Sequence, residues 1–341
     1  MEINLISDTV TKPCESMIAA MANAKVGDDV FKEDPTVNKL EKKLSDMFGM
    51  ESALFFPSGT MANQTAIKIH TSPGDQLICD KYAHVFNYEG GGVSFNSGVS
   101  CKLLDGKRGM FKNDQLVDAI NPPDFYHSPK SSLVCIENTT NKGGGACWEI
   151  NELKKIKKTC REHNLSIHLD GARIWNALVQ KNQTPKDYGL IFDTISVCLS
   201  KGLGCPSGSV LLGNKDHINS ALRIRKVLGG GMRQVGYLAA CGLYAIENNI
   251  KRLDQDHKKA KQIEQTLNEM SYVELVEPVE TNIIIFEIKK KIDSKDFLNK
   301  LNDFGIKIIS MGGPKLRIVT HLDYTDELHY DFLRILKELK F

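Results

Sequence analysis

Lys201 is the residue of this chain whose setting most requires a chemical explanation. It lies between two apolar runs predicted as core strands, residues 192–199 and 209–212. An ammonium group loses its hydration there, so Lys201 must be paired, neutralised or used covalently. Glycines at 202, 204 and 208 leave the backbone open to a flat group. The alternative is a lysine that extends from a strand end into water.

Asp170 and the segment Ser58-Gly59-Thr60 follow other apolar runs. Asp170 closes the predicted strand 165–170, where a buried carboxylate must be paired or used. In a pyridoxal phosphate enzyme such a carboxylate keeps the ring nitrogen protonated, but it could equally cap the next helix. The segment Ser58-Gly59-Thr60 joins a strand to a helix. Its hydroxyls and N–H groups suit either a phosphate or an ordinary helix cap.

His84 and Arg317 complete the set of candidate side chains. His84 follows a predicted strand and precedes Glu89 and three glycines, so its imidazole could stack on a cofactor ring and relay a proton, or be structural. Arg317 lies within the apolar run LRIVTH. A guanidinium in a strand needs a carboxylate partner, which is either a substrate carboxylate or an acidic side chain of the protein.

Strands that alternate with helices must position these residues. One helix is predicted over 35–48, because Asp34 can cap it, Pro35 opens it and Gly49 ends it. Such alternation predicts an α/β fold with a parallel sheet wrapped on both faces, whose carboxyl edge holds the ligand crevice. The predicted strands are 53–56, 76–80, 100–104, 132–137 and 165–170.

The alternation stops after residue 212. A helix is expected from about 215 to 228, then a long helix that runs from the glycines at 229–231 to about 270. Strands are expected at 272–276, 282–288, 306–310 and 315–320, and helices at 293–304 and 325–339. We therefore expect a large domain over 1–250, in which residues 1–34 form an N-terminal arm, and a small α+β domain over 251–341.

Composition narrows the class of protein. The chain has 341 residues, of which 41% are hydrophobic, and a net charge of +2, which favours neither a nucleic-acid partner nor a membrane surface. Nine cysteines without zinc-ligand spacing indicate reduced thiols and no metal centre. No signal peptide and no bilayer-spanning run is predicted. These features predict a cytoplasmic globular protein.

The order of the motifs resembles one family over nearly the whole chain. FFPSGTMANQ, HVFNYEGGG, HLDGARIWNA, CLSKGLGCPSGSVL and LRIVTHLD stand in the register of the low-specificity threonine aldolases, which depend on pyridoxal phosphate. The resemblance implies the aspartate-aminotransferase fold (fold type I). It also implies retro-aldol cleavage of L-threonine or L-allo-threonine to glycine and acetaldehyde. The nearest alternative is a β-eliminating lyase or an aminotransferase of the same fold. A nucleotide-binding protein is disfavoured, because this chain lacks the G-x-G-x-x-G motif after its first strand.

The resemblance also implies roles for individual residues. Lys201 corresponds to the lysine that holds the cofactor as a Schiff base, and Asp170 to the partner of the ring nitrogen. The remaining matches are Ser58, Gly59 and Thr60 for the phosphate, His84 for stacking, Arg173 for the ring oxygen, Ser7 and Arg317 for the substrate carboxylate, Lys226 and Arg233 as basic residues delivered across a subunit interface, and His127 near the β-hydroxyl. Either His84 or His127 is the general base. The resemblance therefore also implies a homo-oligomer, a dimer of dimers whose subunits share active sites.

Two positions depart from the family pattern. Phe31 stands where a tyrosine is frequent, so that hydroxyl is missing. Thr140 stands where a histidine is usual, which removes any role of that imidazole, although Glu137 and Asn141 remain beside it.

Overall fold

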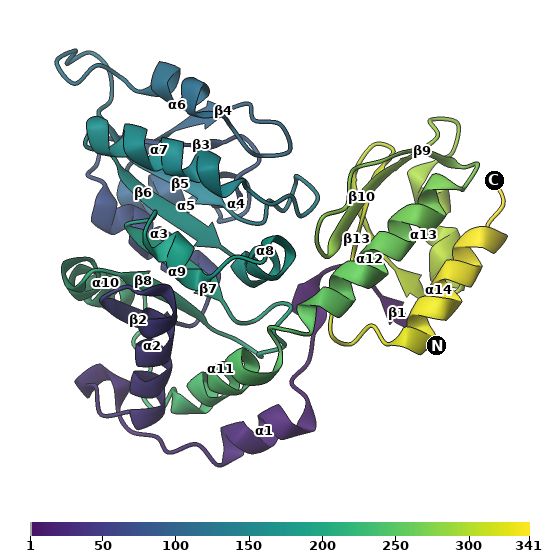
Figure 1. The fold of residues 1–341 in the computed structure, drawn as a ribbon, viewed down its shortest axis with the longest axis horizontal. Coiled ribbons are helices and arrows are strands. Elements are labelled where there is room, and N and C mark those ends of the chain that lie inside the picture. The colour runs from purple at the N-terminus through teal and green to yellow at the C-terminus, as the bar shows by residue number, and fades with distance from the viewer. Residues whose placement is uncertain (1) are drawn as a thin grey trace.

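The computed structural model describes residues 2–341, which form two units joined by helices (Figure 1). A seven-stranded sheet organises the first unit, in the order β2-β8-β7-β6-β5-β3-β4. Its strands are β2 (Ser52–Phe56), β3 (Gln76–Asp80), β4 (Ser100–Leu104), β5 (Ser131–Glu137), β6 (Ser166–Gly171), β7 (Thr194–Cys198) and β8 (Ser209–Gly213). Neighbouring strands from β7 to β4 are parallel, whereas β8 runs antiparallel to both β7 and β2.

Helices cover both faces of this sheet, as the alternation of strands and helices predicts. Alternate strand residues divide between the two faces: Ile78 and Val134 belong to one apolar cluster, and Leu77 and Leu133 to another. The helices of the unit are α1 (Glu15–Ala22), α2 (Pro35–Phe48), α3 (Gly59–His70), α4 (His84–Asn87), α5 (Gly92–Ser97), α6 (Asn113–Ala119), α7 (Ile150–Glu162), α8 (Ile174–Lys181), α9 (Pro185–Gly189), α10 (Lys215–Val227) and α11 (Gly236–Asn248).

Local chemistry sets the ends of α2 where the sequence predicts them. The Asp34 carboxylate accepts hydrogen bonds from the N–H groups of Thr36 and Val37, and Pro35 opens the helix. Gly49 ends the helix in the left-handed region, with φ of 65°. The expected helix 35–48 is therefore confirmed.

The second unit is a four-stranded antiparallel sheet of order β12-β13-β10-β9, and one of its faces packs against three helices (Figure 1). Its elements are α12 (Leu253–Asn268), β9 (Val273–Val276), β10 (Ile283–Ile288), α13 (Ser294–Asp303), β11 (Ile306–Lys307), β12 (Ile309–Gly312), β13 (Lys315–Val319) and α14 (Asp326–Glu338). Strand β1 (Ile3–Asn4) pairs in parallel with β11, so this N-terminal strand packs on the second unit.

The expected long helix up to residue 270 is wrong. Two helices, α11 and α12, stand in its place, separated at 249–252. The Asn249 side chain donates a hydrogen bond to the Leu203 carbonyl at 2.7 Å, so the break fixes the turn that follows Lys201. Among residues 2–341, no helix is both long and apolar enough to cross a membrane.

Candidate active site

The carboxyl edge of the large sheet gathers the candidate residues from separate parts of the chain. The parallel strands β3, β5, β6 and β7 all end there, and β2 runs in the same direction as β7. Glu137 and Asp170 lie at the ends of β5 and β6, whereas His84, Lys201 and Ser58 follow β3, β7 and β2. Residues far apart in sequence therefore meet at one edge, which is where open α/β sheets bind ligands.

Asp170 has one oxygen engaged and one free. Its Oδ1 accepts a hydrogen bond from the Ala172 N–H at 3.1 Å, whereas Oδ2 is buried and has no partner in the described residues. A buried carboxylate oxygen without a donor is costly. The N–H of a protonated pyridine ring would supply that donor, so Asp170 fits the expected cofactor.

Helix α3 begins at this edge with an open N-terminus. Ser58 caps it, since its Oγ accepts from the Met61 N–H at 3.2 Å. A Cβ built on Gly59 would meet nothing within 4 Å, so there is open space beside this residue. The free N–H groups of a first turn attract anions. Ser58, Gly59 and the exposed Thr60 are therefore arranged as a phosphate site needs.

His84 lies at the start of α4 against the buried carboxylate of Glu89, for which the sequence predicted no role. Its Nδ1 lies 3.0 Å from Oε1 of Glu89, and ligand-type atoms of His84, Glu89 and Asp170 lie within 4.8 Å of one another. Burial disfavours the imidazolium, but the hydrogen bond to Glu89 and the charge of Asp170 outweigh it and raise the pKa of His84. The three atoms could also face a cation, although the Glu89 oxygens already accept three hydrogen bonds.

Arg317 projects from β13 toward the large unit. Its neighbours Leu316 and Ile318 point into the core of the second unit, so Arg317 lies on the opposite face. Its Nη1 donates to Asn141 Oδ1 at 2.7 Å and its Nη2 to the Ile6 carbonyl at 3.1 Å, while Nε is buried without a partner. Burial, together with the charge of a neighbouring arginine, lowers its pKa.

No acidic side chain of the described residues forms an ion pair with Arg317. The internal salt bridge, which was the alternative explanation of this arginine, is therefore absent there. Ser7 follows Ile6 directly, and its Oγ accepts from the Thr9 N–H at 3.2 Å. A substrate carboxylate at the Arg317 guanidinium would lie beside the segment that carries Ser7.

Arg173 is committed to Asp8, a residue of the arm that the sequence did not mark as functional. Its Nε and Nη2 each lie 2.8 Å from one oxygen of the Asp8 carboxylate, and both side chains are buried. Burial alone would raise the pKa of Asp8, but Arg173 overcomes it and holds that pKa at about 2. Asn282 of the second unit donates to the same carboxylate at 3.2 Å. Asp8 thus joins the arm to both units.

Lys201 is half-buried just beyond β7. Its carbonyl accepts a hydrogen bond from Thr11 Oγ1 at 2.9 Å, so the arm fixes its backbone. The ammonium group forms no ion pair within residues 2–341, although its charge contributes to the lowered pKa of Asp8. The sequence required this lysine to be paired, neutralised or used covalently. Pairing with an acidic side chain of residues 2–341 is not observed.

Three expected residues form no hydrogen bond or ion pair with Lys201, Asp170 or His84 among the described residues. His127 lies in the loop before the first residue of β5, at the opposite edge of the sheet, where its ring packs on Tyr126 with centroids 4.1 Å apart. Lys226 lies at the end of α10, and Arg233 is half-exposed and paired with Asp28 at 2.8 Å. The structure of a single chain does not bring these three side chains to Lys201.

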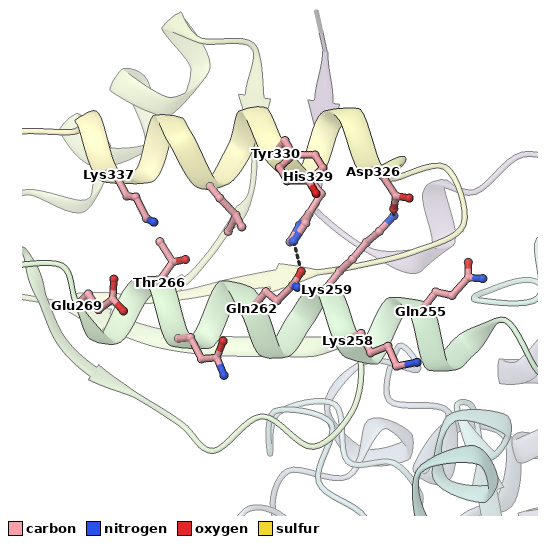
Figure 2. Close-up of a pocket in the computed structure, with 12 residues that line it drawn as sticks. Gln255, Lys258, Lys259, Gln262, Thr266, Glu269, Asp326, His329, Tyr330 and Lys337 are labelled. Atoms are coloured by element: carbon pink, nitrogen blue, oxygen red, sulfur yellow. Dashed lines mark hydrogen bonds and ion pairs between the residues drawn. The ribbon is translucent and has the colours of Figure 1, made fainter.

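A groove of about 610 Å³ lies elsewhere, between α12 and α14 of the second unit (Figure 2). Its side chains pair with one another: His329 Nε2 lies 2.6 Å from Gln262 Oε1, and Lys259 lies 2.9 Å from Asp326. None of the residues expected at the site lines this groove. We therefore assign the chemistry to the edge of the large sheet.

Glu137 gives the site a measurable pH dependence. It is buried beside Asp170, its partner in the β5–β6 register, and accepts from the N–H groups of His84 and Asn141, both at 2.8 Å. Burial and the charge of Asp170 raise the pKa of Glu137 to about 7. A carboxyl whose pKa is raised on folding stabilises the fold below its unfolded pKa and loses that contribution as pH rises through the folded value.

We expect Glu137→Gln to gain stability relative to the wild type as pH rises from 5 to 8. A pKa of about 7 instead of 4.5 corresponds to about 3 kcal/mol over that range. Buried histidines with lowered pKa act in the opposite sense, but both proteins share them. Because the charge of Glu137 also helps to raise the pKa of His84, the difference reports Glu137 together with its effect on that imidazole. Urea unfolding of the cofactor-free proteins measures it, and parallel stability curves would contradict the assignment.

This chain is similar to known proteins in sequence and in structure. The family described as beta-eliminating lyase matches residues 4–291. Low-specificity L-threonine aldolase 1 of Arabidopsis thaliana is 38% identical over 337 residues, which cover 96% of this chain and 94% of that protein. The low-specificity L-threonine aldolase of Escherichia coli (strain K12) is 38% identical over 328 residues, covering 95% of each chain.

Solved structures show the same architecture. A threonine aldolase from Leishmania major superposes with a TM-score of 0.84 at 20% identity, over 98% of this chain and 99% of that one. At such low identity the superposition concerns the fold alone. It confirms the expected fold class, an α/β large domain of the aspartate-aminotransferase type with a mostly parallel sheet and a small second domain.

Proposed function

Because the chain belongs to the low-specificity L-threonine aldolases within the beta-eliminating lyase family, we propose that it cleaves L-threonine and L-allo-threonine to glycine and acetaldehyde. The observation that carries the proposal is a pair of unsatisfied groups at one site. Asp170 has a buried oxygen without a donor, and Arg317 has a buried Nε without a partner and no acidic side chain beside its guanidinium. Asn141 and Glu137 connect them through hydrogen bonds and the strand register.

The proposed cofactor is pyridoxal 5'-phosphate. It supplies an electron sink for the bond that breaks at Cα. Lys201 would bind it covalently, Asp170 would keep its ring nitrogen protonated, and the first turn of α3 with Ser58, Gly59 and Thr60 would hold its phosphate. The His84 imidazole would lie against the ring. Because Asp8 already occupies Arg173, that arginine has fewer N–H groups left for the ring oxygen.

Arg317 and Ser7 would orient the substrate. With its carboxylate held by the Arg317 guanidinium, the substrate cannot rotate freely about the N–Cα bond, so the Cα–Cβ bond can be fixed perpendicular to the ring. His84 would then take the β-hydroxyl proton as acetaldehyde leaves. Within one chain His84 is the better base, because His127 lies at the opposite edge of the sheet. A positioned base contributes about 10²–10⁴-fold to the rate.

We also propose that the protein is cytoplasmic and at least a dimer, with Lys226, Arg233 and His127 delivered to a neighbouring site, and a dimer of dimers as the full assembly. Exposed apolar side chains near the first two support this: Phe31 is 70% and Val227 77% exposed. Sedimentation of the purified protein tests the assembly.

A product assay tests the function. The purified protein with pyridoxal phosphate should release equal amounts of glycine and acetaldehyde from L-threonine and from L-allo-threonine. If the protein released pyruvate and ammonia from serine and no acetaldehyde from threonine, it would be a β-eliminating lyase instead. Transfer of the amino group to a keto acid would show an aminotransferase. 1-Amino-2-propanol, which lacks the carboxylate, should not be cleaved if Arg317 holds that group.

A further inference from the structure

Glu89 lies at the end of a buried row of polar side chains that the proposed reaction does not use directly. Three N–H donors converge on its carboxylate: Asn63 Nδ2 at 2.9 Å, Gln64 Nε2 at 2.7 Å and His84 Nδ1 at 3.0 Å. A carboxylate can only accept hydrogen bonds, so His84 must carry its proton on Nδ1. Its Nε2 is then left with the free lone pair that a general base needs.

The Asn63 amide is held in one orientation by hydrogen bonds to its oxygen. Its Oδ1 accepts from Ser196 Oγ at 2.7 Å and lies 3.2 Å from His168 Nε2. Two donors on the amide oxygen hold the NH₂ group toward Glu89, whereas a flipped amide would set oxygen against carboxylate. Asn63 and His168 therefore determine how Glu89 is held.

The tautomer of His168 is fixed in turn. Its Nδ1 lies 2.9 Å from Thr194 Oγ1, and His70 Nε2 lies 3.0 Å from the same oxygen. Because His168 Nε2 donates to Asn63, its Nδ1 must accept the single Thr194 hydroxyl proton, and His70 must donate to that oxygen. Every hydrogen bond of the row, from His70 to Glu89, then points toward the carboxylate.

The row crosses the interior of the sheet. Thr194 is the first residue of β7, and His168 and Asn63 are 0% and 2% exposed, so none of them can reach a ligand at the carboxyl edge. Apolar residues of the same size would avoid the cost of burying polar groups. A fully satisfied buried network instead restricts its members to one arrangement.

We propose that Asn63 and His168 are positioning residues of the reaction, which act through Glu89 to fix the tautomer and orientation of His84. The inference rests on the proposed function, because it gives His84 the role of base. Asp170, Glu137 and the ring of Tyr88 also face His84, and the variants below leave them unchanged.

The first test compares Asn63→Leu, which removes both ends of the amide, with the wild-type holoenzyme. We expect kcat for threonine cleavage to fall at least about tenfold, at the lower end of what a general base contributes, with KM changed less than about threefold. The acidic limb of the kcat–pH profile should move to lower pH, because a weaker hold of Glu89 on His84 lowers the pKa of the base. Loss of stability alone would not move that limb.

A matched pair at His168 keeps the test decisive if Asn63→Leu does not fold. His168→Met removes the donor and should shift the acidic limb in the same direction, whereas His168→Gln keeps an N–H donor and should restore most of the wild-type profile. Thr65→Val is the control: Thr65 is buried on the same helix as Asn63, but its hydroxyl has no partner, so kcat and the limb should stay unchanged.

A second readout does not depend on activity. Exchange of the imidazole carbon-bound proton, followed by mass spectrometry of peptides, reports the pKa of His84 in the cofactor-free protein; that pKa should fall in Asn63→Leu and His168→Met. Unchanged values, with coincident acidic limbs, would overturn the inference. If the pKa of His84 is higher in the wild type than in the two variants, but the wild type does not cleave threonine, the proposed function alone is overturned.

Discussion

Replacing Lys201 by alanine is expected to abolish threonine cleavage and the visible absorbance band of the bound cofactor together. Lys201 is half-buried and forms no ion pair among residues 2–341, so its replacement by alanine breaks no salt bridge. The loss of kcat should exceed about 10³-fold, the scale on which removal of a single essential catalytic group slows an enzyme. Absorbance spectra and steady-state rates, measured with excess pyridoxal phosphate, check both effects.

Lys157→Ala is the matched control for this experiment. Lys157 is also half-buried in the large unit, but it pairs with Asp193 at 2.6 Å. Its removal should cost some stability and leave the absorbance band intact. Borohydride reduction should add the mass of the cofactor to the wild type and to Lys157→Ala but not to Lys201→Ala. A Lys201→Ala protein that keeps the band and the wild-type rate would remove Lys201 from the site.

Signals local to the sequence predicted much of this structure. The capping of α2 by Asp34 and Gly49 depends on neighbours within a few residues, and the apolar runs of β5 and β6 need only burial. The ends of the strands placed Asp170 and Lys201 at one edge, because parallel strands share a carboxyl edge. The elements of the second unit between 272 and 339 also lie close to their predicted positions, except that the single strand expected at 306–310 is two short strands, β11 and β12, in different sheets.

Long-range partners could not be found in the same way. Asp8 lies 165 positions from Arg173, and within its own segment it resembles an ordinary turn residue. Glu89 stands before a run of glycines, and only the fold brings Asn63 against it, 26 positions away. The break between α11 and α12 depends on a contact of Asn249 with Leu203. Each of these depends on which elements become neighbours, which periodicity does not encode.

Replacing Asp170 by asparagine should nearly abolish turnover while the protein keeps its fold. Asparagine preserves the shape and can still accept from the Ala172 N–H, but it carries no charge to hold a proton on a ring nitrogen beside Oδ2. Without that proton the ring is a weaker electron sink at the moment the Cα–Cβ bond breaks. Loss of an electrostatic group aimed at developing charge costs about 10²–10³-fold in kcat.

The matched control is Asp80→Asn, the same substitution at the carboxyl end of β3, which is separated from β6 by β5. Asp80 is also buried, but both of its oxygens are occupied, since they accept from the N–H groups of Tyr82 and Gly106 at 2.8 Å. Its replacement should lower the midpoint of urea unfolding and leave kcat within a few-fold of the wild type. Asp170→Asn should show the reverse, because its amide nitrogen replaces an oxygen that has no protein partner to lose. Equal kcat losses in the two variants would mean that the unpartnered oxygen at Asp170 has no special part in the reaction.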